Sequence, residues 1–146
     1  MADGLAERIR SDLNEARKAR DKFRVTLLTT LLSDVKNRQI EVGRPLADDD
    51  VVEVLTRAVK RRQEAAEQMR AGGRAELAEK EESEAAVIAE YLPAPLTEDE
   101  VRALVREAKE SGAASLGAVM GWLMPRIRGR FDGKEANRIA REEIGG

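Results

Sequence analysis

Two amino acids that often carry enzymatic chemistry are missing from this chain, which contains no histidine and no cysteine. Their absence excludes imidazole as a general base or metal ligand, cysteine as a nucleophile, and disulfide bonds. The five serines have no histidine to pair with, and no spacing to a lysine or glycine elbow marks an activated nucleophile. We therefore expect no catalytic residues and no cofactor.

Carboxylates cluster at residues 48–50, 79–84 and 98–100, where a divalent metal site has to be considered. The first and third clusters are explained by the preference for negative charge at the start of a helix. The second is a run on a charged helix face, without a loop to wrap an ion. We expect no metal site.

The residues best suited to bind a ligand lie in the segment RIRGRFDGK, residues 126–134, just ahead of an expected helix. Guanidinium and ammonium groups, backbone N–H groups and the positive end of a helix dipole would converge there, as a phosphate backbone requires. The alternative is a glycine-containing turn whose arginines are only solvated. The candidate RNA-binding residues are Arg126, Arg128, Gly129, Arg130, Gly133, Lys134 and Arg138.

Two other basic stretches, residues 17–24 and 60–62, are interleaved with Glu and Asp at the spacing of helical ion pairs. We interpret them as solvated faces rather than as ligand sites. Trp122, flanked by Met120 and Met124, is expected to fill a small core, with stacking on a nucleobase as the alternative.

These residues must be positioned by helices, because apolar residues recur at three- and four-residue steps along the chain and aromatic residues make up only 3%. We predict an all-α fold. The pattern predicts one long helix from Leu5 to just before Gly43. A second helix is expected from Asp48, as its N-cap, to about Arg70, and its later, alanine-rich part is expected to project or pack lightly.

A third helix is expected from Ala75 to Tyr91, and the proline-rich segment LPAPLT at 92–97 then forms a stiff connector. We place the boundary between two subdomains here, with an N-terminal helical subdomain at 1–93 and a smaller C-terminal one at 94–146.

The C-terminal subdomain is predicted to be a cluster of three helices. Each is preceded by a residue that can cap it, and the first has the pattern of a capping box. The residues expected to begin or end these helices are Thr97 with Glu100, Gly112, Ser115, Pro125 or Gly129, and Asp132.

The overall charge gives no sign of a polyanionic partner, since 26 basic residues face 28 acidic ones for a net charge of -2. Any binding to nucleic acid must therefore come from a local patch. The charged N-terminus lacks the apolar segment of a signal peptide, and no run approaches membrane-spanning length. We expect a cytoplasmic protein with no membrane partner.

Several short motifs, taken in order, resemble the YqeY-like family. The match extends over nearly the whole chain and includes the N-terminal helix. The motifs are RVTLLTTLLSDVKN at 24–37, RRQ at 61–63, YLP at 91–93, GA at 112–113, GAVM at 117–120, LMP at 123–125, and GRFDGK at 129–134 followed by Asn137.

The resemblance implies an α-helical N-terminal part joined to a smaller helical part, which is similar to the tail domain found in one component of the glutamine-dependent aspartyl/glutamyl-tRNA amidotransferase. Relatives of that domain help to hold tRNA, and family members often carry the label of a carbon–nitrogen ligase that uses glutamine as amide donor. The hypothesis is therefore an accessory tRNA-binding module without catalytic residues. The alternative is an interaction or assembly factor that docks on amidotransferase subunits or another translation component. The oligomeric state is left open.

Overall fold

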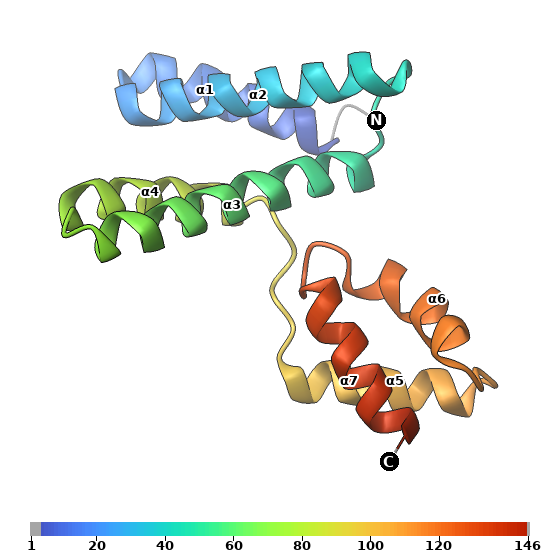
Figure 1. The fold of residues 1–146 in the computed structure, drawn as a ribbon. Helices are drawn as coiled ribbons and strands as arrows, with labels where there is room; N and C mark the ends of the chain where they lie inside the picture. The colour runs from blue at the N-terminus through green and yellow to red at the C-terminus, as the bar shows by residue number, and fades with distance from the viewer. Residues whose placement is uncertain (1–3, 146) are drawn as a thin grey trace. The chain divides into compact units, whose positions relative to one another are not determined.

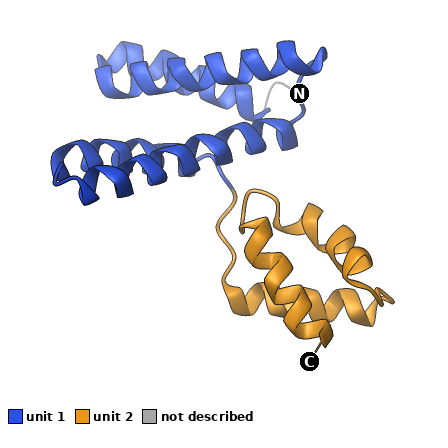
Figure 2. Cartoon of the chain, in the orientation of Figure 1, with its two compact units in different colours: residues 1–92 blue, residues 93–146 orange. Residues whose placement is uncertain are grey.

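The fold is all-α, as the sequence predicts. A computed structural model describes residues 4–145, which form seven α-helices and contain no strand. The chain divides into two compact units, residues 1–92 and 93–146, shown in blue and orange in Figure 2. We call them the N-terminal unit and the C-terminal unit and describe each by itself.

The prediction of one long first helix is wrong, because the chain reverses at Arg20 to give α1 (Leu5–Ala19) and α2 (Lys22–Val42), which pack against each other (Figure 1). The Asp21 carboxylate then caps α2 by accepting a hydrogen bond from the Arg24 N–H at 3.1 Å. The apolar spacing hides this reversal because both helices turn their apolar faces to the same core, and the turn contains neither glycine nor proline.

Helix α3 (Asp48–Ala71) does not project, as the sequence had suggested for its later part, but packs along α4 (Ala75–Ala89) in the most extensive helix–helix contact of the described residues. The small side chains allow the two backbones to approach closely, which is why a face with little but alanine still supports packing. The buried alanines of this hairpin are Ala58, Ala66, Ala78 and Ala85.

The expected capping role of Asp48 is also corrected. The residue before α3 is Ala47, and Asp48 is the first residue of the helix. The Asp48 carboxylate instead accepts a hydrogen bond from the Leu5 N–H at 3.0 Å and so ties the start of α1 to the start of α3. Asp50 accepts the Ala47 N–H at 3.0 Å, which satisfies a free donor at the start of α3.

The core of the N-terminal unit is aliphatic, and its most deeply buried large side chains come from all four helices. Tyr91, just after α4, is also buried and donates a hydrogen bond to the Asp12 carboxylate of α1. The fully buried large residues of this core are Ile9, Leu28, Leu31, Val51, Leu55 and Ile88.

The C-terminal unit is the predicted three-helix cluster, formed by α5 (Glu98–Glu110), α6 (Leu116–Ile127) and α7 (Gly133–Gly145). The capping box before α5 is confirmed. The Glu100 N–H donates to the Thr97 hydroxyl at 3.1 Å and the Thr97 N–H to the Glu100 carboxylate at 2.9 Å. Ser115 caps α6 by accepting the Ala118 N–H at 3.2 Å.

Helix α6 continues through Pro125 to Ile127, so of the two possible terminators only Gly129 lies beyond the helix. Proline at this position removes the N–H that would donate to the carbonyl of Gly121, an exposed residue. Trp122 is half-buried against the core together with Met120 and Met124, in agreement with the packing role expected for it.

Candidate nucleic-acid interface

The segment between α6 and α7, residues 126–134, is a basic turn whose backbone is held by specific hydrogen bonds. The N–H groups of Arg130 and Phe131 both donate to the Ile127 carbonyl, at 2.8 and 3.0 Å. Ile127 itself is fully buried in the core of the C-terminal unit. Gly129 has a φ of 74°, a left-handed conformation that glycine adopts without steric cost.

The basic turn is also bonded to the connector that leads into α5. The Leu96 N–H donates to the Arg130 carbonyl at 2.8 Å, and Nε of Arg130 donates to the Ala94 carbonyl at 2.9 Å. These bonds fix the direction of the Arg130 side chain, and its terminal N–H groups make no hydrogen bond with the residues from 4 to 145. The turn is therefore an ordered platform for its cationic side chains.

Arg126 is engaged with the tryptophan one helical turn earlier. Its guanidinium carbon lies 3.6 Å from the centroid of the Trp122 ring, and the same group donates a hydrogen bond to the Trp122 carbonyl. A cation over an indole face is attracted by the ring quadrupole. A nucleobase can stack on that face of Trp122 only by displacing Arg126.

Arg128 and Lys134 are the freest cations of the basic turn. Both side chains are exposed, and neither makes a hydrogen bond or ion pair with any residue from 4 to 145. A cation in this state can bind a phosphate without first breaking an internal contact. Gly133, just before Lys134, lies close to Met124, so a Cβ there would stand 3.5 Å from the Met124 methyl group.

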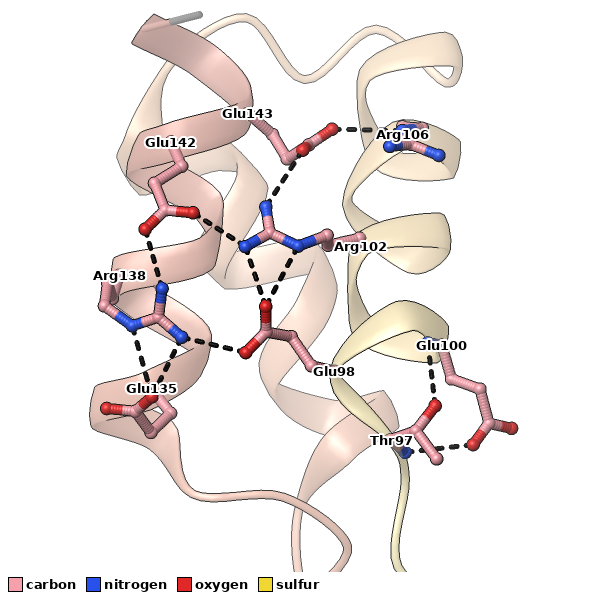
Figure 3. A network of polar contacts seen from close by, with 9 residues as sticks. All are labelled: Thr97, Glu98, Glu100, Arg102, Arg106, Glu135, Arg138, Glu142 and Glu143. Carbon is pink, nitrogen blue, oxygen red and sulfur yellow. Dashed lines mark hydrogen bonds and ion pairs between the residues drawn. The ribbon is translucent and has the colours of Figure 1, made fainter.

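Arg138 differs from the other candidates, because three carboxylates surround its guanidinium (Figure 3). The distances are 3.0 Å to Glu98, 3.0 Å to Glu135 and 2.6 Å to Glu142. Hydrogen bonds to these carboxylates, first of all to Glu135, raise the pKa of Arg138 further above its ordinary value. The structure thus places Arg138 in a contact between α5 and α7 rather than in the basic turn.

Arg102 of α5 shares this network and was not singled out by the sequence analysis. It contacts Glu98 at 2.9 Å, Glu142 at 2.7 Å and Glu143 at 3.1 Å, and it is only 21% exposed. Hydrogen bonds from Arg102, and then from Arg138, lower the pKa values of Glu98 and Glu142. Only the contact to Glu98 has a signal in the sequence, the four-residue helical spacing. The partners on α7 lie some 40 positions away.

The described residues offer little to acid–base or metal chemistry. Burial, followed by the hydrogen bond to Asp12, raises the pKa of Tyr91 and keeps its hydroxyl protonated. Within residues 4–145, no group of acidic side chains is arranged to hold a metal ion, and no helix has the length and apolar character needed to span a bilayer. Binding through exposed cations is the chemistry that the arrangement supports.

Comparison with known proteins bears on the whole chain rather than on the turn alone. A family profile described as Yqey-like protein matches residues 6–144. The chain belongs to the YqeY-like family. This membership covers both units of the YqeY-like chain, including the basic turn and the network around Arg102.

Fungal proteins are among the relatives of this YqeY-like chain. An uncharacterized protein from Schizosaccharomyces pombe is 36% identical over 86 residues, which cover 58% of this chain and 69% of the relative. Altered inheritance of mitochondria protein 41, mitochondrial, from Lachancea thermotolerans is 32% identical over 85 residues, 58% of this chain and 46% of that protein. The protein of the same name from Pyrenophora tritici-repentis is 26% identical over 146 residues, 94% of this chain and 80% of the relative.

Proposed function

We propose that this YqeY-like chain is an accessory RNA-binding module that holds tRNA and has no catalytic residues of its own. The observation that carries the proposal is the pair Arg128 and Lys134, two exposed cations with no partner among residues 4–145, on a turn held by backbone hydrogen bonds. The resemblance of the C-terminal unit to the tail domain of a tRNA amidotransferase component supports tRNA as the RNA. Cytoplasmic location remains part of this proposal.

In this proposal Arg128 and Lys134 supply the main phosphate contacts, and Arg126 and Arg130 add donors that their internal contacts leave available. Gly129 adds no side chain to the turn, so that a phosphate can approach the backbone there closely, whereas Gly133 makes room for the Met124 methyl group. We give Arg138 a structural role, because binding a phosphate would require it to leave three carboxylates. Such contacts position RNA without reading its sequence.

Fluorescence anisotropy with labelled tRNA across a salt series tests the proposal. We expect the Arg128→Ala/Lys134→Ala variant to bind about tenfold more weakly, with a salt slope reduced by about two. The control is Lys36→Ala/Arg141→Ala, which removes the same charge from two exposed positions that make no ion pair with residues 4–145. Absence of binding at low salt, or an equal loss in the control variant, would contradict the site.

A second candidate function is docking on amidotransferase subunits or another translation component. Two features of the surface of the N-terminal unit favour it. Ile40 of α2 is 69% exposed, which is unusual for a large aliphatic side chain. Between α2 and α3 lies a groove of about 390 Å³ that is lined by both acidic and basic side chains. Calorimetric titration with a purified amidotransferase tests this function, and Ile40→Asp is expected to weaken an interaction that the tRNA-site variant leaves unchanged.

A further inference from the structure

A second concave surface lies in the N-terminal unit, where α1 turns into α2. Two hollows of about 390 and 400 Å³ meet there, and Lys22 and Thr26 line both of them. Phe23 and Lys80 lie in the first hollow, which extends from α2 to α4. Because the hollows share a wall, the surface is longer than a site for one small ligand.

The charge of this surface is opposite to that of the whole chain. Five cations line the two hollows against one carboxylate, Glu84, which is itself paired with Arg62 at 2.9 Å. The other four cations are exposed and make no ion pair with the described residues. We call these four the basic corner: Arg17, Arg20, Lys22 and Lys80.

Arg20 occupies a backbone position that usually belongs to glycine. Its φ of 59° makes it the one non-glycine residue with positive φ in the described part of the chain. The Arg20 N–H donates to the Arg17 carbonyl at 3.1 Å, and the Asp21 N–H donates to the Ala16 carbonyl at 3.0 Å. These two bonds define a Schellman motif with Arg20 in its left-handed position.

The same pair of bonds ends α3 and α5, and there the chain uses Gly73 and Gly112 with φ of 74° and 108°. An arginine in the left-handed region carries a steric cost that glycine avoids. The attraction of positive charge to the C-terminal end of α1 does not explain why residue 20 is an arginine. Arg17 and Lys18 already place positive charge in the last turn of that helix. Neither the backbone conformation nor the charge at the end of α1 accounts for an arginine at this position, and its side chain stands exposed at the corner.

We propose that the basic corner is a second RNA-binding surface, which takes the phosphate backbone of a single-stranded segment and stacks a base on Phe23. The proposal rests on the proposed function for its ligand class and adds a surface separate from the basic turn. Phe23 is 38% exposed beside Lys22, the combination of aromatic face and cationic track that single strands require. Each hollow has the size of a small-ligand pocket, so the pair accommodates consecutive nucleotides.

The test uses the full chain and a fluorescein-labelled oligouridylate of about ten nucleotides, with anisotropy measured across a salt series. We expect Arg20→Gly/Lys22→Ala/Lys80→Ala to bind at least about tenfold more weakly with a flatter salt slope. The matched control, Lys36→Ala/Lys60→Ala/Arg74→Ala, removes three exposed, unpaired cations elsewhere in the N-terminal unit and should retain most of the affinity.

Two single variants separate binding from stability and stacking from charge. Arg20→Gly should weaken binding without lowering the thermal midpoint, because it relieves the left-handed strain. Phe23→Leu should weaken binding several-fold at an unchanged salt slope, because it removes the stacking face and no charge. A lower midpoint for Arg20→Gly with unchanged binding would assign the arginine to the fold and overturn the proposal.

The same oligonucleotide with Arg128→Ala/Lys134→Ala distinguishes the two RNA surfaces. If binding of the oligonucleotide depends on the basic corner and not on the basic turn, the inference stands, and the basic turn is judged by its own test with tRNA. If the corner variant binds as tightly as the unchanged chain, or the control variant loses as much affinity, the inference is overturned while the basic turn keeps its own test. No binding of the oligonucleotide by the unchanged chain also overturns it.

Discussion

Arginines of the C-terminal unit differ in function according to their surroundings rather than their spacing. Arg138 and Arg102 are enclosed by carboxylates of α5 and α7, whereas Arg128 is exposed and has no partner within residues 4–145. A guanidinium that already holds three carboxylates must give them up to bind a phosphate. The exposed one gives up only water, so it is the better ligand-binding residue.

The carboxylates of this network make the C-terminal unit sensitive to acid. Hydrogen bonds from Arg102 lower the pKa values of Glu98 and Glu142, and Arg106, then Arg102, lowers that of Glu143. A carboxylate whose pKa is lower in the folded state adds stability above its unfolded pKa, about 4.3, and loses it as the pH falls through the folded value. The network is therefore intact at neutral pH.

We predict that the thermal midpoint of the C-terminal unit falls as the pH drops below about 4.3. The Arg102→Ala variant should have a lower midpoint at pH 7. Its midpoint should also fall less on acidification, because the carboxylates have lost the arginine that lowers their pKa values. Melts at several pH values followed by the fluorescence of Trp122, which lies in the C-terminal unit, measure both effects. Arg141→Ala is the control, because Arg141 is an exposed arginine of α7 outside this network. An Arg102→Ala protein with the acid sensitivity of the unchanged chain would contradict the linkage.

At the scale of elements, the hairpin of α3 and α4 shows how small residues support packing. Ala58 and Ala78 are fully buried, and Ala66 and Ala85 nearly so. The Arg62–Glu84 pair at 2.9 Å and the Arg70–Glu82 pair at 2.6 Å flank this contact. Backbones that approach across alanines leave no space for a longer side chain.

We predict that Ala78→Leu destabilises the N-terminal unit by about 1–3 kcal/mol, because the added atoms overpack the contact between α3 and α4. Ala86→Leu, at an exposed position of the same helix, is the matched control and should change stability by less than about 0.5 kcal/mol. Urea unfolding followed by circular dichroism gives both values. Equal stability of the two variants would show that the hairpin is looser than its buried alanines indicate.

At the scale of the whole molecule, each unit has a hydrophobic core of its own. Leu28, Leu31 and Leu55 are buried in the N-terminal unit, and Leu123 and Ile139 in the C-terminal unit. The chain contains one tryptophan, Trp122, which packs against the second core. Its fluorescence therefore reports on the C-terminal unit alone.

We predict that Leu123→Ala destabilises the C-terminal unit by about 2–5 kcal/mol and leaves the N-terminal unit unchanged, because the lost contacts and the new cavity lie within one core. Tryptophan fluorescence in urea and hydrogen exchange of α2 report the two units separately. Leu28→Ala is the reciprocal variant, with the opposite pattern expected. Loss of protection in both units from either substitution would show that the cores unfold together.

The candidate site was partly accessible from the sequence. The glycines and the density of Arg and Lys mark the basic turn, because a turn, its cap and its charge are local properties. Glu135 and Glu142 lie at helical ion-pair spacing from Arg138, but the sequence does not show that Glu98 of α5 also contacts it, so it did not separate Arg138 from Arg128. Nor did it find the basic corner, because Lys80 joins Lys22 only when α4 packs near α2.

The sequence by itself determined the helical class, the capping box at Thr97 and the family. These depend on residue spacing, local hydrogen bonds and motif order. Only the tertiary structure decided the reversal at Arg20, the packing of the alanine face of α3, and which cations are neutralised. Contacts between residues far apart in the chain carry these outcomes, as when α1 and α2 pack against each other where the apolar spacing indicates one helix.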